Sequence, residues 1–377
     1  MAKIKLILFE FVLFAFFIVF MKAESMGLIL VLTGVAALGF YGLRRSLRFR
    51  QSFAGASAGY RWLDYLIAFV LLLSIPFIFS ESPYLIHICI MAALYAIMAM
   101  GLNFSWGSSG MPHFATSAFF GIGSYTAALL SIHLHTGFWI NIVLGSLCAA
   151  IFAVLQGLTT LKTKSYYLAL VTMAFALIFY QFVLTVDFTG GPRGILNIPY
   201  PKFFGVDLAS PSTIFGVKLP FQANFFYLIV FFGLLGLICA QRLHNSWLGM
   251  TWNYIREDEI VTRCQGISVA KAKLQAFALD AVFSGFAGVF YAHYISYVGA
   301  ANADNIISVV LIIMVILGGT DNVAGVILGA ILLTILPEKF RAFQDYRLII
   351  YGTMVLVMLI FRPRGILPRK VRIHEKG

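Results

Sequence analysis

The sequence predicts an all-α polytopic membrane protein, and three observations lead to this fold class. Of its 377 residues, 61% are hydrophobic and 11% are charged, whereas an average soluble domain has roughly 25% charged residues. The mean hydropathy of the chain is +0.92. The apolar residues also form successive runs, most of them near the length that a helix needs to cross about 30 Å of hydrocarbon. We expect about ten to twelve transmembrane or re-entrant helices in two pseudo-symmetric halves with glycine-broken helices.

The net charge of the chain, +12, does not indicate a protein that binds nucleic acid. The basic residues cluster at the ends of apolar runs, where they orient the chain and face anionic membrane lipid. Because basic loops stay in the cytoplasm, the arginine-rich loop at 44–61 and the basic tail at 368–377 predict that both termini are cytoplasmic. The four cysteines have no paired spacing, so we predict neither disulfides nor metal ligands among them.

The first 80 residues are predicted to form an N-terminal transmembrane extension that contains the basic cytoplasmic loop. Its apolar runs are 6–21, 26–43 and 62–80. The first run is like a signal peptide but has no small-x-small cleavage site after it, so we expect it to be retained as a span.

Residues 81–367 are predicted to form the core of the protein. Its apolar runs are 83–103, 112–134, 139–160, 166–186, 224–240, 274–298, 306–317, 323–336 and 348–361. The runs at 306–317 and 323–336 are short, and two interpretations stay open for them: two full spans or one re-entrant hairpin. Both interpretations leave the segments before and after the pair on the same side of the membrane. Lys162 and Lys164 predict that the chain is on the cytoplasmic side again after the run at 139–160.

The segment at 187–222 is predicted to be an external loop. It is rich in glycine, proline and phenylalanine, and it carries Arg193, Lys202 and Lys218. Two interpretations fit this composition: a structured surface loop that meets an extracytoplasmic partner, or an ordinary lid over the helix bundle.

The segment at 242–273 is the longest clearly charged interval, and we expect it to lie in cytoplasmic water. Its residues predict one short helix: Thr251 or Asn253 as the N-cap, Glu257, Asp258 and Glu259 in the first turns, Arg263 near the end and Gly266 as the stop. This helix is predicted either to dock a partner protein or to serve as a solvated connector.

Two glycine-rich breaks interrupt the apolar runs in a related way. The residues concerned are Asn103, Gly107 and Gly110 in the first break, Gly121 and Gly123 in the helix after it, and Gly318 and Gly319 in the second break. Irregular backbone at membrane depth is tolerated only where it is buried in protein or lines a water-filled cavity. The breaks therefore predict a transport pathway, and the alternative is ordinary tight turns with glycines at helix contacts.

Few ionisable residues lie inside the apolar runs. A charge at the bilayer centre costs about 2.5–3.5 kcal/mol, so we expect Asp280 to reach the interface or to pair with Lys273. His87, His113 and His293 have neither metal-ligand spacing nor nearby acids, which predicts histidines satisfied at helix contacts and no metal site. No nucleophile can be matched with a base, so no catalytic residue is predicted. The chain has no phosphate loop, so any ATP must bind another chain.

Several sequence blocks point to a known family. They are Asn103 with Gly101, AFFGIGSYTAALL, YYLALVTMAFALI followed by TGGPRGILNIP, IREDEI with GISV, GFAGVFYAHYISYV, VILGGTDNVAGVILGAILLTILPE and LIFRPRGIL. Together, in one order between Leu94 and Leu367, they resemble the LivM-type permeases of branched-chain amino acid ABC importers. The run GMPHFAT departs from the family pattern, because His113 stands about three residues early and Thr116 takes the usual histidine position.

The resemblance implies a permease subunit that forms the translocation path for branched-chain or similar amino acids in the bacterial cytoplasmic (inner) membrane. It implies four kinds of partner: membrane lipid, a second LivH-like permease, two ATPase subunits that carry ATP and Mg, and a periplasmic or lipid-anchored solute-binding protein. It implies that the loop with Arg256, Glu257, Asp258, Glu259 and Gly266 docks the ATPase. Arg193, Lys202 and Lys218 are expected to contact the binding protein.

One alternative function stays open from the residues alone. A stand-alone ion- or proton-coupled secondary transporter of a small polar solute would use Asp280 or Glu10 as the carrier of the coupling ion.

Overall fold

The all-α polytopic fold is confirmed by a computed structural model of the chain. The structure describes residues 2–23, 61–160, 165–203, 206–214 and 216–339, and also 349, 352–353, 356, 360 and 365–367. Within this part of the chain, ten helices have 14 residues or more, and the strands have two or three residues each. The predicted run at 26–43, most of the loop at 44–61, most of the run at 348–361 and the tail at 368–377 lie outside the described residues.

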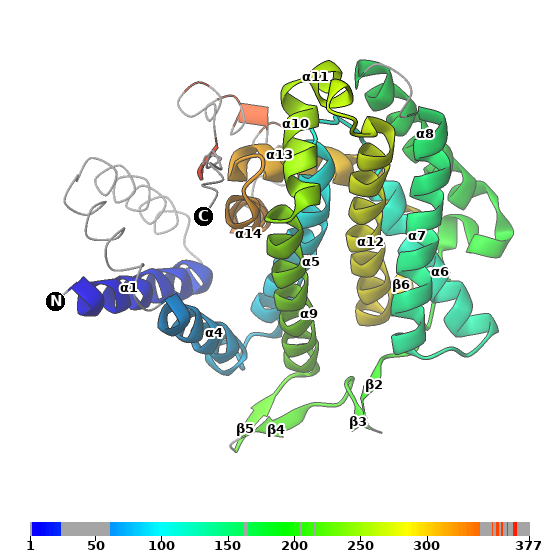
Figure 1. The fold of residues 1–377 in the computed structure, drawn as a ribbon. Coiled ribbons are helices and arrows are strands. Elements are labelled where there is room, and N and C mark those ends of the chain that lie inside the picture. The colour runs from blue at the N-terminus through cyan, green and yellow to red at the C-terminus, as the bar shows by residue number, and fades with distance from the viewer. Residues whose placement is uncertain are drawn as a thin grey trace.

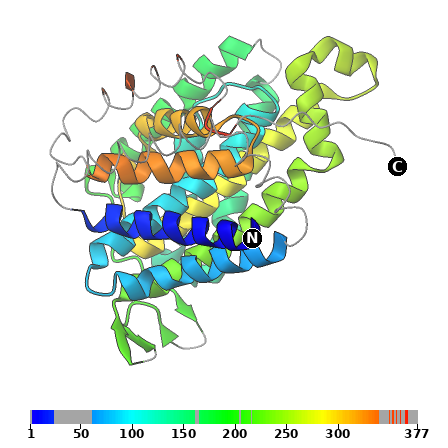
Figure 2. The same ribbon diagram turned by 90° about the vertical axis from the view of Figure 1, so that its left-hand side faces the viewer.

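The N-terminal extension contributes two described helices, α1 (Ala2–Lys22) and α4 (Arg61–Ile78). They contact one another, and α4 also contacts α9 (Phe221–His244) of the core. Both helices lie to one side of the core helices (Figures 1 and 2).

The core is assembled around α12 (Val269–Ile295). This helix packs against α5 (Pro83–Leu102), α6 (Thr116–His133) and α7 (Phe138–Thr160), and the bundle also contains α8 (Ser165–Thr185) and α9. The helix α5 continues without interruption into the π-helix η1 (Asn103–Ser108). Five stretches of the described chain are long and apolar enough to cross a membrane: Pro83–Ser108, Phe138–Thr160, Tyr167–Thr185, Phe221–His244 and Val269–Ile295.

Two shorter apolar helices, α13 (Asn305–Gly318) and α14 (Val323–Lys339), pack against one another. At 1.5 Å per residue, α13 is about 21 Å long, which is less than the thickness of the hydrocarbon layer. The helix α14 contacts α5 and crosses it instead of running along it. The two views show this, since α14 is seen nearly end-on in Figure 1 and lengthwise in Figure 2.

The segment at 187–222 is a structured loop. It contains η2 (Asp187–Thr189), η3 (Gly191–Arg193), β1 (Ile195–Leu196), β2 (Lys202–Phe203), β3 (Val206–Asp207), β4 (Ser212–Ile214) and β5 (Val217–Leu219). β1 pairs antiparallel with β6 (Tyr297–Val298), which follows α12 directly. The His293 Nδ1 atom lies 2.7 Å from the Pro199 carbonyl oxygen, and Ser296 Oγ donates to the Ile198 carbonyl at 2.6 Å. These contacts fix the loop to the end of α12, next to η4 (Ala300–Ala303).

The charged segment at 242–273 forms two helices, so the prediction of one helix was wrong. They are α10 (Trp247–Glu257) and α11 (Glu259–Cys264), and we call residues 247–264 the hairpin. Thr251 and Asn253 are buried within α10 and cap nothing, because the helix already begins after Ser246. The Asp258 carboxylate instead accepts from the backbone nitrogens of Ile260, at 2.7 Å, and Val261, at 3.1 Å.

Because Asp258 caps a second helix, the three acidic residues do not lie together in the first turns of one helix, contrary to the sequence prediction. Glu257 ends α10, Asp258 lies between the helices and Glu259 begins α11. An aspartate at an N-cap satisfies the free backbone N–H groups of a new helix. The prediction for the other end is confirmed, because Arg263 lies in the last turn and Gly266 follows with a φ of +79°, a value that glycine adopts without strain.

The hairpin and the strands β2 to β5 lie at opposite ends of the long core helices (Figure 1), which makes the predicted sidedness testable. Cys264 on α11 is exposed, and Lys218 on β5 is exposed. In a variant that keeps only Cys264, we expect a membrane-impermeant maleimide to label that cysteine from the cytoplasmic side alone. A Lys218→Cys variant without other cysteines should be labelled from the outside alone. Labelling in the reverse pattern would contradict the topology.

Candidate functional site

The two glycine-rich breaks, which the sequence presents as separate features, meet in the folded protein. The Ser108 hydroxyl donates to Asp321 Oδ1 at 2.7 Å. The Asp321 backbone nitrogen donates to Asn103 Oδ1 at 2.9 Å, across 218 positions of the sequence. All three residues are buried, with at most 3% of their surface exposed. The end of α5 and the turn between α13 and α14 are thus held together.

Glycine at 107 and 319 makes this meeting sterically possible. A Cβ atom on Gly107 would lie 2.8 Å from the Asp321 nitrogen and would also overlap the Asn103 side chain. Gly319 has a φ of +115°, which other residues rarely adopt. Gly318 meets Gly325 of α14, where a Cβ would lie 2.6 Å from the Gly325 carbonyl carbon.

Arg256 of the hairpin is bonded to both breaks. Its Nη1 donates to the Gly107 carbonyl oxygen at 2.5 Å, and its Nη2 donates to Thr320 Oγ1 at 3.4 Å. Its aliphatic stem lies beside Gly110, whose φ is +69°. Arg256 is an exposed residue, but its guanidinium bonds to the two breaks of this chain, whereas the sequence predicted only a docking role for it. We call Asn103, Gly107, Ser108, Arg256, Thr320 and Asp321 the junction.

Two further contacts fix the hairpin to the start of α12. The Trp252 indole Nε1 donates to the Ala272 carbonyl at 2.8 Å, and Lys273 forms an ion pair with Glu259. The outward side of the hairpin keeps Glu257 and Asp258 exposed. It also exposes four large hydrophobic side chains, those of Trp247, Tyr254, Ile260 and Val261.

Asp280 lies inside the bundle, so the predicted interfacial position was wrong. Its Oδ2 atom accepts from Thr116 Oγ1 at 3.2 Å and lies 3.3 Å from His113 Nε2. Ser284 Oγ donates to Asp280 Oδ1 at 3.3 Å. Lys273, the partner expected from the sequence, pairs with Glu259 instead.

His113 therefore has an acid beside it, contrary to the sequence prediction. Its Nε2 atom also lies 2.7 Å from Ser105 Oγ in η1, and both His113 and Asp280 have 0% of their surface exposed. The two residues are 167 positions apart in the chain, and the fold of the first break against α12 brings them together. The buried Asp280 side chain, which accepts from Thr116 and Ser284 and lies beside His113, therefore connects α12 with α6 and with the coil before it.

The other predicted pathway glycines lie at helix contacts. A Cβ on Gly121 would lie 2.7 Å from Phe179 Cε1, and one on Gly123 would lie 2.6 Å from Gly285 Cα of α12. For these two positions the structure has the close helix packing that the sequence left as the alternative to a pathway.

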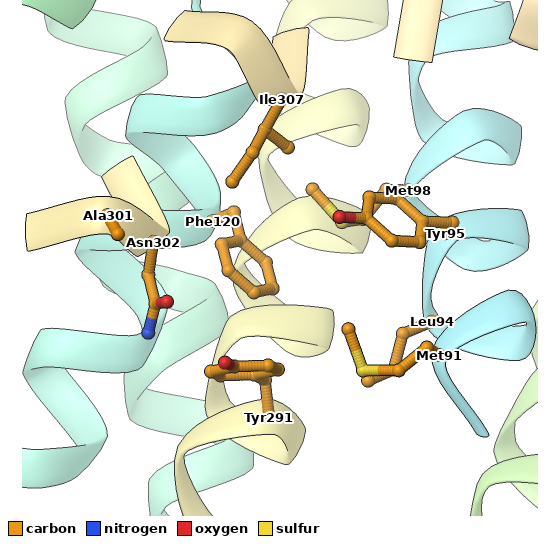
Figure 3. A pocket seen from close by; sticks show the side chains of 9 residues that line it. All are labelled: Met91, Leu94, Tyr95, Met98, Phe120, Tyr291, Ala301, Asn302 and Ile307. Carbon is orange, nitrogen blue, oxygen red and sulfur yellow. The ribbon is translucent and has the colours of Figure 1, made fainter. Parts of the chain in front are cut away.

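A cavity of about 260 Å³ lies beyond the junction, between α5, α6, α12, η4 and α13. Nine side chains line it (Figure 3): Met91, Leu94, Tyr95, Met98, Phe120, Tyr291, Ala301, Asn302 and Ile307. None of them was predicted as a site residue. Their apolar and aromatic types are typical of any helix contact, so no local sequence pattern sets them apart.

These features define a class of protein. A bundle of membrane-length helices, with paired glycine breaks and a cavity between the helices that carry them, is typical of membrane transport proteins. The chain belongs to the family described as branched-chain amino acid transport system / permease component, which matches residues 84–359. The resemblance found in the sequence is thereby confirmed.

Three relatives illustrate the family. The high-affinity branched-chain amino acid transport system permease protein LivM of Salmonella typhimurium (strain LT2) is 34% identical over 306 residues, 78% of this chain and 72% of the relative. LivM of Escherichia coli (strain K12) is 34% identical over 312 residues, 79% and 73% of the two chains. LivH of the same strain is 24% identical over 294 residues, 74% and 92%. No solved structure gives a significant match.

The junction predicts a strong effect for the smallest possible change at Gly107. The added methyl group of Gly107→Ala would force Asn103 and Asp321 apart. We expect the variant to lose about 1–3 kcal/mol of stability, measured as a lower Tm of the purified protein, and to transport poorly. Gly137→Ala is the matched control, because nothing lies within 4 Å of the Cβ that it adds. Equal Tm values for the two variants would show that the junction is not tightly packed.

The buried Asp280 side chain gives a second prediction. Asp280→Leu removes the acceptor for Thr116 and Ser284 and leaves these buried hydroxyl groups without a partner, so we expect it to cost about 1–3 kcal/mol of stability. Asp280→Asn keeps an acceptor of the same shape and should cost less. Thermal unfolding of both variants measures the difference. A leucine variant as stable as the asparagine variant would rule out a role for these hydrogen bonds in stability.

Proposed function

We propose that this chain is the membrane-spanning permease subunit of an ATP-driven importer in the bacterial inner membrane, and that it forms the path for branched-chain or similar amino acids. The observation that carries the proposal is the family match over residues 84–359, the part of the chain that contains both breaks, the hairpin and the cavity. No catalytic residue is proposed for this chain. ATP and Mg are proposed to bind two ATPase partners.

A second, LivH-like permease and a solute-binding protein complete the proposed complex. Similarity to both LivM and LivH relatives supports a pairing of two related permeases. The binding protein, periplasmic or lipid-anchored, is proposed to contact the loop at 187–222. There Arg193, Lys202 and Lys218 are exposed, and the strands β2 and β5 that carry the two lysines lie at the end of the core opposite the hairpin (Figure 1).

The hairpin is proposed to dock the ATPase through its outward face. The exposed fractions of Ile260 and Val261 on α11 are 74% and 54%. Clustered apolar side chains at an aqueous surface mark protein interfaces, and a few such anchors carry most of the energy of binding. Glu257 and Asp258 supply a charged rim beside them. The sequence placed the docking role on the charged residues, whereas the structure supports apolar anchors inside that rim.

The contacts of the hairpin with the two breaks suggest how a movement of the ATPase partner is transmitted to the translocation path. Arg256 bonds the hairpin to both breaks. The helix α5 enters the junction at one end, and four of its side chains line the cavity. The helix α13 also ends at the junction, and its Ile307 lines the cavity. A displacement of the hairpin would therefore move two walls of the cavity together.

Reconstitution tests the function as a whole. The chain, co-expressed with the candidate partners encoded alongside it, should copurify with them and take up leucine into proteoliposomes only with ATP and loaded binding protein. The alternative, a stand-alone secondary transporter that uses Asp280 or Glu10, requires ion-driven uptake by the purified chain alone. Such uptake would overturn the proposal.

A single substitution tests the docking surface. Ile260→Asp places a charge on the proposed apolar anchor, and loss of an anchor worth at least about 2 kcal/mol would weaken ATPase binding roughly 30-fold. We expect the purified complex to lose ATPase subunits, and uptake to fall. Val217→Asp, which changes an exposed valine at the opposite end, should leave the subunit content unchanged. Normal subunit content and uptake in Ile260→Asp would contradict docking at this face.

A further inference from the structure

The cavity in Figure 3 is lined mainly by apolar side chains. None of its nine lining residues is charged. Phe120 lies between Tyr291 and Ile307, Tyr95 and Met98 lie to one side of it, and Asn302 lies to the other (Figure 3). The cavity thus has a mainly apolar wall, three of whose nine residues are aromatic, and a polar group at one edge.

The polar group at that edge has an unused donor. The Asn302 Nδ2 atom is buried and has no hydrogen-bond partner among the residues that the structure describes. A buried donor without a partner costs free energy, and such a cost is tolerated where a ligand supplies the acceptor. The hydroxyl groups of Tyr95 and Tyr291 are two further polar groups of the wall.

A zwitterionic amino acid cannot enter such a cavity whole, because no charged group is present to replace the water around its ammonium and carboxylate groups. Its apolar side chain can enter, since burial of apolar surface is favourable. The carboxylate would then lie at the edge of the cavity, within reach of a donor such as the Asn302 amide.

We infer that this cavity receives the apolar side chain of the amino acid in transit and limits its size, with Asn302 donating to the carboxylate. The inference rests on the proposed function and adds a size filter within the permease itself. The two methionines of the wall, Met91 and Met98, are flexible and adapt to different branched shapes. Ile307 forms a fixed wall opposite them and sets the size limit.

The test compares two neighbouring isoleucines of α13. Ile307 lines the cavity, whereas Ile306 is 48% exposed and does not. The assay measures the uptake of leucine and of valine by the complete reconstituted importer, each supplied on saturated binding protein so that the affinity of that protein does not matter. In Ile307→Phe, the leucine-to-valine ratio should fall about tenfold, the effect of one methylene group in a tight pocket. In Ile307→Ala, the ratio should rise.

The controls are Ile306→Phe and Ile306→Ala, which should keep the ratio of the unchanged importer. Asn302→Leu should lower the uptake of both solutes and leave their ratio unchanged, because it removes the donor to a group that both solutes share. If Ile307→Phe assembles poorly, Ile307→Ala carries the test in the opposite direction.

Equal ratios in the Ile307 and Ile306 variants would overturn the size filter while leaving the proposed function intact. Failure of the unchanged importer to take up either solute with ATP would overturn the proposed function, and the size filter with it.

Discussion

The hydrogen bonds around Asp321 are the constraint on which the rest of the arrangement depends. The side chain of Asp321 accepts from Ser108 and its backbone nitrogen donates to Asn103, so two chain breaks share one buried contact. A break in a membrane helix leaves backbone groups without partners, and each unmet group is costly away from water. The contact gives the backbone nitrogen of Asp321 an acceptor in the first break, and glycine at 107 leaves room for the approach.

This contact also explains why the hairpin and the cavity belong to one mechanical unit. Arg256 binds a carbonyl of the first break and a hydroxyl next to Asp321, while Trp252 and Lys273 fix the hairpin to α12. The helices that enter the junction, α5 and α13, both line the cavity. A force applied to the hairpin therefore has a continuous path of hydrogen bonds and rigid helices to the cavity.

Sequence reasoning could predict the fold class, the core helices and both breaks, because hydropathy and glycine are local signals. It could not predict that Asp321 meets Asn103, since that depends on how α14 crosses α5. The position of Asp280 was missed for the same reason: its partners Thr116 and His113 come from another helix and the coil before it. The hairpin was predicted as one helix because Thr251 or Asn253 suits its N-cap and Asp258 suits its first turns, whereas Asp258 caps the second helix.

The bonds of Arg256 to both breaks imply that the hairpin and the second break move as one body. Pulsed electron–electron spin resonance can test it with labels at Val261 on the hairpin, at Ala324 next to the second break and at Val217 at the far end, all exposed positions. Between the nucleotide-free and ATP-bound complexes, the account predicts an unchanged distance distribution for the 261–324 pair and a shifted one for the 261–217 pair. A 261–324 distance that changes as much as the 261–217 distance would contradict it.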